Sequence, residues 1–261
     1  MSAGGAKWSD LRRRALSGVL MLVLGAFGVY QGGLFFVVMV CAICGAMVWE
    51  TARMFATRQA VGLGIAAGVV MLALNFLPGT FALPLMLGLA LVAASQTAED
   101  GPLAFVVIAW VLLACFALLW VRAGHETLWI LWLILVVIAS DVAGYFAGRM
   151  LGGPKFWPRF SPKKTWSGTI AGWLLAGIVG LFFLRPLGMG LELIPMSMLA
   201  GFAGQMGDIA ESAVKRRKGI KDSSSLIPGH GGVFDRFDAM LGGSAAALLF
   251  WAVGLMPGAG G

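Results

Sequence analysis

Charged residues are scarce in this sequence. Asp, Glu, Lys and Arg make up 12% of the 261 residues, whereas 59% are hydrophobic and the mean hydropathy is +0.90. Soluble domains contain about 25% charged residues. The composition therefore excludes an ordinary soluble domain and indicates an integral membrane protein.

Cysteine and histidine are also rare, with three Cys and two His. Cys41 and Cys44 have the spacing of a metal motif, but they lie in an apolar run without a nearby histidine, so we interpret the cysteines as small buried hydrophobic residues. His125 is interpreted as a loop residue. The sequence contains no P-loop, and Gly62 and Gly64 open an apolar run without the strand and helix of a dinucleotide-binding motif.

Apolar residues are gathered into about nine runs separated by short polar breaks. Because barrel strands would alternate in polarity, we predict an all-α fold, a polytopic transmembrane bundle of about nine helices. We expect a single integral membrane domain over residues 1–261, with no cleaved signal. The runs are Leu16–Tyr30, Leu34–Val48, Ala60–Leu77, Leu83–Ala94, Leu103–Val121, Leu128–Phe146, Thr169–Leu184, Leu191–Ile209 and Ala239–Met256.

The distribution of Lys and Arg predicts the orientation. If the N-terminus is cytoplasmic and nine spans follow, Arg122 and Arg185 are the only basic residues outside. Cytoplasmic loops of membrane proteins carry an excess of Lys and Arg, so this bias favours a cytoplasmic N-terminus. The same rule explains the net charge of +7, which therefore does not imply nucleic-acid binding.

One polar segment, Ser212 to Asp238, interrupts the apolar pattern on the predicted cytoplasmic side. Charged groups near lipid are costly, so such a cluster is a candidate functional site. Asp235 and Asp238 are spaced to face one divalent cation, and Arg236 beside them can meet phosphate oxygens. Glycines around His230 let backbone N–H groups approach an anion. Oxygen ligands favour Mg²⁺ over Zn²⁺.

The apolar run before this segment ends in further charges. If its helix continues, Asp208, Glu211 and Lys215 share one face. A Glu211–Lys215 salt bridge would explain Glu211 but would leave Asp208 unexplained. Each feature alone also has an ordinary interpretation, since the basic run can fix topology and an acidic pair can cap a helix.

Together these residues resemble the signature of the phosphatidate cytidylyltransferases, also called CDP-diacylglycerol synthases. A second region, beginning at Asp141 and Tyr145 and ending in Ser161–Trp166, is similar to a further element of that family, so the site region runs from residue 141 to 238. Ser167 and Ala239 depart from the family pattern. The signature positions that match are Ser212, Val214, Lys215, Arg216, Lys221, Asp222, Ser224, Ile227, Pro228, His230, Gly231, Gly232, Val233, Asp235, Arg236, Phe237 and Asp238.

The resemblance implies that CTP and phosphatidate react to give CDP-diacylglycerol and pyrophosphate in phospholipid biosynthesis. It also implies Mg²⁺ as cofactor and a bacterial plasma membrane, and it leaves open a second, monovalent cation and a homodimer. Because the attacking lipid phosphate is already an anion, no general base is required. Two polyanions must meet, so cations are needed to neutralise them.

The expected roles follow from that chemistry. Predicted metal ligands, or residues next to them, are Asp208, Asp222, Asp235 and Asp238. Predicted catalytic residues are Asp208, Asp235, Lys221 and Arg236. Predicted CTP contacts are Lys215, Arg216, Lys221 and Arg236, with His230, Gly231 and Gly232 shaping the phosphate loop. Predicted phosphatidate contacts are Arg149, Lys163 and Lys164, with Asp141 nearby.

Two other classes remain open at this stage. A CTP-dependent kinase for a lipid alcohol would use a similar membrane fold and metal, but it would need a base for its hydroxyl nucleophile. A transporter or anion channel would place charges along a transmembrane path instead of in a one-sided cluster. Transfer of the α- or γ-phosphate of CTP into lipid would separate the three.

Overall fold

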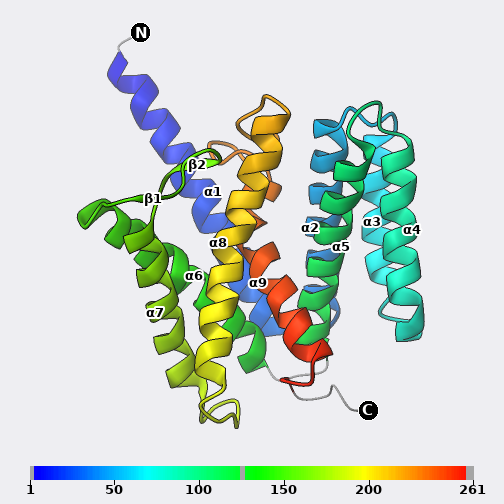
Figure 1. Cartoon of the computed structure of the whole chain (residues 1–261). Coiled ribbons are helices and arrows are strands. Elements are labelled where there is room, and N and C mark those ends of the chain that lie inside the picture. Colours follow the sequence, from blue (N-terminus) through cyan, green and yellow to red (C-terminus); the bar gives the residue numbers. More distant parts are fainter. Residues whose placement is uncertain (1–2, 124–126, 257–261) are drawn as a thin grey trace. The chain divides into compact units, whose positions relative to one another are not determined.

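Helices dominate the computed structural model, which describes residues 3–123 and 127–256 (Figure 1). For residues 3–13 and 123 it describes the backbone only, and His125 lies outside the described residues. The elements of this described part are α1 (Ala3–Gln31), α2 (Gly33–Met54), α3 (Ala60–Ala73), the 3₁₀ helix η1 (Gly79–Phe81), α4 (Ala82–Ser95), α5 (Gly101–Ala123), α6 (Thr127–Met150), β1 (Lys155–Trp157), β2 (Ser161–Thr165), α7 (Trp166–Phe183), α8 (Leu193–Arg217) and α9 (Phe234–Ala252).

Several of these helices are suited to a membrane. Among the described residues, five helices are long and apolar enough to cross it, namely α2, α6, α7 and most of α1 and α5. This confirms a mostly helical integral membrane protein. The apolar helices α3 and α4 have 14 residues each, fewer than the roughly 17 that a full span needs. The number of nine spans therefore stays a prediction.

The chain forms two compact units, described separately below. Unit 1 contains residues 1–112 and 220–237, and unit 2 contains residues 113–219 and 238–261. Helix α9 begins in unit 1 and continues in unit 2. The single domain that we expected is still a prediction.

In unit 1, helices α2 and α3 lie side by side because glycines face each other (Figure 1). A Cβ added at Gly64 would lie 2.7 Å from the carbonyl oxygen of Gly45, so no larger residue permits this approach. Cys41 and Cys44 are buried free thiols in α2, as the sequence suggested.

In unit 2, helices α6, α7 and α8 pack together and are linked by buried hydrogen bonds (Figure 1). The amide of Gln205 in α8 donates to the Ser140 hydroxyl of α6, at 2.9 Å, and to the Thr169 carbonyl of α7, at 3.4 Å. The Trp132 indole donates to the Ser197 hydroxyl at 2.8 Å. In lipid, the hydrophobic effect does not drive helices together, so interhelical hydrogen bonds of this kind help to hold them at fixed positions.

A β-hairpin joins α6 to α7. Strands β1 and β2 pair in antiparallel fashion, Lys155 with Thr165 and Trp157 with Ser161. Thr165 then caps α7, because its hydroxyl accepts the N–H of Gly168 at 3.3 Å. The hairpin thereby fixes the two lysines of β2, Lys163 and Lys164, relative to the bundle.

Candidate active site

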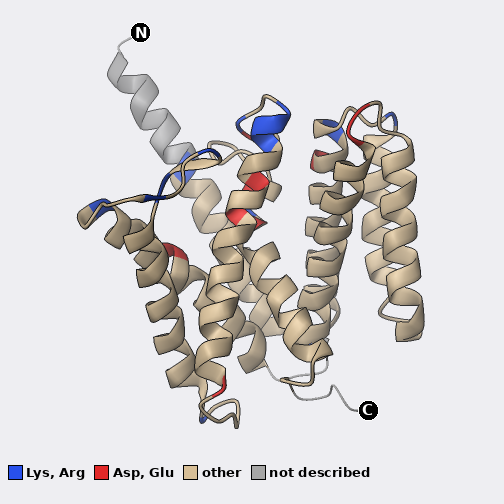
Figure 2. Cartoon of the chain, in the orientation of Figure 1, with Lys and Arg blue, Asp and Glu red and all other residues tan. Residues whose placement is uncertain are grey.

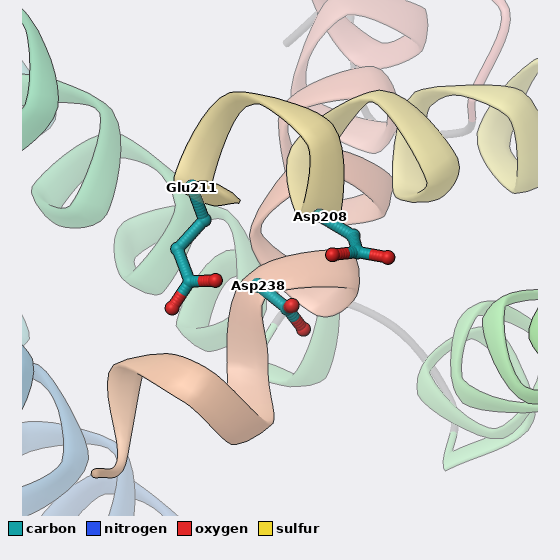
Figure 3. A group of neighbouring side chains, drawn as sticks. All are labelled: Asp208, Glu211 and Asp238. Atoms are coloured by element: carbon teal, nitrogen blue, oxygen red, sulfur yellow. The ribbon is translucent and has the colours of Figure 1, made fainter. Parts of the chain in front are cut away.

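Three carboxylates gather in unit 2, where α8 meets α9. Asp208 and Glu211 come from α8 and Asp238 comes from α9 (Figure 3). One oxygen from each lies within 4.8 Å of the others. This acidic cluster includes two of the four predicted ligands, Asp208 and Asp238. It also includes Glu211, which was not predicted as a ligand because a salt bridge to Lys215 explained its charge.

Glycines bring the two helices close enough to form this acidic cluster. A Cβ at Gly207 of α8 would overlap the carbonyl oxygen of Asp238, and one at Gly242 of α9 would overlap the carbonyl oxygen of Ala203. The backbones can cross at this distance only because neither position has a side chain. Gly207, which precedes Asp208 in the sequence, thus has a packing role that places Asp238 beside it.

Two lysines neutralise part of the acidic cluster. The Lys164 ammonium of β2 lies 2.6 Å from the Asp208 carboxylate and also donates to the Gln205 carbonyl at 3.2 Å. Lys215 lies 2.7 Å from Glu211, which is the salt bridge that the helical spacing suggested. Asp141 of α6 interacts electrostatically with Lys164 and Asp208. Three clustered carboxylates with two lysines leave a net negative charge, which favours a divalent cation.

The remaining predicted headgroup and nucleotide cations of unit 2 are exposed. Arg149 donates to the Tyr145 hydroxyl at 2.8 Å, and Lys163 and Arg216 are exposed on β2 and at the end of α8. Figure 2 shows that the hairpin and the C-terminal end of α8 lie at one end of unit 2, whereas the α7–α8 connection lies at the other. The predicted basic site residues of this unit therefore lie toward one end of its helices.

In unit 1, the signature loop between α8 and α9 folds around Asp235. This buried carboxylate accepts the Ser223 N–H at 2.9 Å, the Ser223 hydroxyl at 3.0 Å and the Gly232 N–H at 2.7 Å. A carboxylate with such bonds organises the backbone around it. Among the described residues, Asp235 does not belong to the group of three carboxylates that could hold a metal ion. Its role as a ligand stays a prediction.

The glycines of the signature form a tight turn with His230 near its tip. Ile227 and Gly231 form an isolated antiparallel bridge, and Gly229 and Gly231 have φ angles of 77° and 85°, a conformation that side chains disfavour. The His230 Nδ1 lies 2.8 Å from the hydroxyl of Ser17 in α1, which also donates to the Pro228 carbonyl at 2.9 Å. Helix α1 thus fixes the turn.

A cavity of about 600 Å³ lies beside this turn, entirely within unit 1. Its wall includes three cations, Lys221, Arg236 and Arg14, of which only the first two were predicted as site residues. Asp222 and His230 also line it. In the sequence, Arg14 is one of the basic residues that the orientation argument places on the cytoplasmic side, and nothing in its local sequence separates that role from a role in the cavity.

Sequence reasoning also missed Glu50 of α2. Its side chain is completely buried and accepts hydrogen bonds from four groups of the signature loop and the start of α9. The predicted apolar run Leu34–Val48 ended two residues before Glu50, so Glu50 was treated as part of the polar break after a span. The available signal was a lone acid directly after an apolar run, which marks a candidate site in a membrane protein.

Fold and site together define a helical membrane protein with an acidic cluster and a cationic cavity. The model of the cytidylyltransferase family matches residues 12–254, so the chain belongs to this family. This match confirms the resemblance drawn from the signature.

Curated relatives resemble the chain over most of its length. A phosphatidate cytidylyltransferase of Brucella suis biovar 1 is 34% identical over 263 residues, covering 94% of each chain. One from Helicobacter pylori strain J99 is 33% identical over 242 residues, covering 89% of each. One from Bacillus subtilis strain 168 is 29% identical over 254 residues, covering 89% of this chain and 94% of its own.

Proposed function

We propose that this protein transfers the cytidylyl group of CTP to phosphatidate, releasing pyrophosphate and forming CDP-diacylglycerol in phospholipid biosynthesis. Two findings support this reaction. The family match covers residues 12–254, and the similar relatives are phosphatidate cytidylyltransferases. The single structural observation that carries the proposal is the acidic cluster with its two lysines. Joining two phosphate-rich substrates requires both kinds of charge in one place.

The acidic cluster fits a magnesium ion by its chemistry. Asp208, Glu211 and Asp238 offer only carboxylate oxygens, the donors that Mg²⁺ prefers, and contain no sulfur or imidazole that would favour zinc. When bound, Mg²⁺ would neutralise phosphate oxygens and the charge of the departing pyrophosphate. Asp222 and Asp235 remain predicted ligands, although in unit 1 Asp222 lines the cavity and Asp235 organises the loop.

The chain's own cations then have distinct tasks. We propose that Lys221 and Arg236 bind the phosphate chain of CTP in the cavity of unit 1. Lys164 and Lys215 are held by Asp208 and Glu211, and we propose that their ammonium groups also bind phosphate oxygens of the substrates. The phosphate of phosphatidate attacks as an anion, so these side chains orient it and reduce repulsion instead of removing a proton.

The membrane placement belongs to the same proposal. We infer nine spans in a bacterial plasma membrane, with the N-terminus and the site on the cytoplasmic side, because the basic residues concentrate on one side of that arrangement. Phosphatidate could then enter from the leaflet with its acyl chains in lipid. Exposed Lys163 and Arg149 are suited to attract its anionic headgroup.

Radiolabelled CTP tests the reaction directly. Purified protein with phosphatidate and Mg²⁺ is expected to transfer ³²P from the α-position of CTP into chloroform-extractable lipid. Label entering lipid from the γ-position would instead indicate a lipid kinase. No incorporation from either position by a folded protein, with several lipid acceptors, would refute the proposed activity.

A further inference from the structure

Glu50 is a charged residue in an unusual place. It lies near the end of α2, a helix that is apolar enough to span a membrane, and its relative exposure is 0%. Its neighbours Met47, Val48 and Ala52 are buried as well. A buried carboxylate is costly unless it is paired or accepts hydrogen bonds, so its retention requires a specific set of partners.

Those partners come from a segment more than 170 positions later in the sequence. Oε1 accepts the Ser224 hydroxyl at 2.6 Å and the Val233 N–H at 2.9 Å. Oε2 accepts the Phe234 N–H at 2.7 Å and the Ser223 hydroxyl at 3.2 Å. All of these residues belong to unit 1. Both oxygens therefore bind the signature loop, each through one hydroxyl and one backbone amide.

The two backbone amides lie at the start of α9, whose first residue is Phe234. The first N–H groups of a helix have no partner within the helix, and the helix dipole favours an anion at this end. Glu50 thus caps α9 from a different helix. A Cβ at Gly232 would lie 2.5 Å from Glu50 Oε1, so Gly232, which follows His230 and Gly231 in the sequence, also permits this close approach.

Glu50 also acts together with Asp235 on the same loop. The Ser223 hydroxyl lies 3.2 Å from Glu50 and 3.0 Å from Asp235, and its single proton can be donated to only one of them at a time. Between them, the two carboxylates bind Ser223, Ser224, Gly232, Val233 and Phe234. The loop that carries Lys221 and His230 and leads to Arg236 is therefore fixed by buried negative charge.

We propose that Glu50 is a positioning residue that holds the signature loop and the start of α9 in the geometry required by the cationic cavity of unit 1. The inference rests on the proposed function, since that cavity is where we place the phosphates of CTP. Glu50 does not line the cavity. It acts through Ser224, Val233 and Phe234, and so its effect is on the arrangement of Lys221 and Arg236.

The test compares Glu50→Gln with wild type. Gln has nearly the same shape, but its amide NH₂ group cannot accept, so either Val233 or Phe234 would lose its acceptor and face a donor. We expect kcat/KM for CTP to fall by about 10²-fold, the size of loss that a misplacement of about 1 Å produces. Glu50→Asp, which keeps the carboxylate, should recover part of this loss.

Thr51→Val supplies the matched control. Thr51 is adjacent, equally buried, and donates only within its own helix, to the Met47 carbonyl at 2.8 Å. This variant also removes a buried polar group from α2, but the hydrogen bond that it removes is within α2 and does not involve the signature loop. We expect its kcat and KM to match wild type whatever its thermal stability. If Glu50→Gln lowers stability yet retains wild-type kcat and KM well below its unfolding temperature, the positioning role is refuted.

Hydrogen exchange tests the inference without relying on enzymatic activity. In Glu50→Gln, the backbone amides of residues 223–234 should exchange faster than in wild type, whereas in Thr51→Val they should not. Unchanged exchange would refute the inference even if the protein is active, and faster exchange would support it even if CTP is not the substrate. If Glu50→Gln does not fold, Glu50→Asp and Ser224→Ala provide the same comparison with milder changes.

Discussion

At the scale of single residues, Asp208 carries the most direct prediction. Asp208→Asn removes one carboxylate of the acidic cluster and the partner of Lys164 while preserving the side-chain shape. A bound metal ion stabilises transition-state charge by several kcal/mol, and each 1.36 kcal/mol is a factor of ten in rate. We expect a loss of about 10²-fold or more in kcat, measured by transfer of the CTP α-label into lipid.

The control for this variant is Glu192→Gln. Glu192 precedes α8, and its carboxylate accepts the nearby Gly190 N–H at 2.8 Å. It lies at the opposite end of α8 from the acidic cluster, so loss of its charge should leave kcat unchanged. A fully active Asp208→Asn protein would exclude the acidic cluster as the metal site.

Arg14 gives a prediction about binding. It is the cation that α1 contributes to the cavity of unit 1. A hydrogen bond to a charged group contributes about 1.5–3 kcal/mol, and 1.4 kcal/mol is a factor of ten in affinity. Arg14→Gln should therefore raise KM for CTP by about tenfold, with KM for phosphatidate unchanged. Arg185→Gln, on the α7–α8 connection, should alter neither constant. An unchanged KM for CTP in Arg14→Gln would exclude this cavity as the nucleotide site.

Residue types and spacing predicted part of this site. Asp208 was predicted as a ligand because a charge near the membrane was otherwise unexplained, and Asp238 because its spacing from Asp235 suits one divalent cation. The structure places Asp208 and Asp238 together. The sequence predicted only a salt bridge for Glu211. Its place beside Asp238 could not be predicted, because spacing along one helix does not show which residues of another helix lie opposite. Glu50 could not be connected to the signature, because contacts between segments so distant in sequence depend on tertiary packing.

At the scale of elements, the crossing of α8 and α9 is the feature that forms the acidic cluster. Gly207→Ala would place a methyl group against the Asp238 carbonyl and force the helices apart. Overpacking of this kind costs about 1–3 kcal/mol. We expect lower thermal stability in detergent and a loss of activity that exceeds the loss of folded protein.

Gly88→Ala is the matched control for the helix crossing. Gly88 lies within α4, and a Cβ there would meet nothing within 4 Å. Because Ala favours a helix over Gly by about 1 kcal/mol, this variant should be as stable as wild type or more stable. Equal behaviour of the two variants would mean that the close crossing does not control the site.

Elements were predictable where the hydrophobic pattern was continuous. The long apolar runs became α2, α5, α6 and α7, whereas the run Ala60–Leu77 was interrupted near Asn75, so α3 ends at Ala73. The hairpin before α7 was not predicted, because its strands are short and basic and show no alternation of apolar residues. Helix α8 runs to Arg217, beyond the predicted apolar run that ended at Ile209, and its last turns include Glu211 and Lys215.

At the scale of the whole molecule, orientation follows from how basic residues are distributed around α7. This helix is one of the five long apolar helices among the described residues. The segment before it contains the lysines of β2, and the connection after it contains Arg185 as its one basic residue. Lys and Arg are retained on the cytoplasmic side, so the hairpin should be cytoplasmic and the connection external.

Cysteine labelling of the two ends of α7 tests this orientation. Arg159→Cys in the hairpin and Pro186→Cys after α7 both replace exposed residues, and the three natural cysteines are buried and give little background. In intact cells, a membrane-impermeant maleimide should label Pro186→Cys but not Arg159→Cys. After permeabilisation both should react, which shows that each thiol is accessible. The reverse pattern in intact cells would place the hairpin, with Lys163 and Lys164, on the side without CTP, and the proposed cytoplasmic reaction would then have to be abandoned.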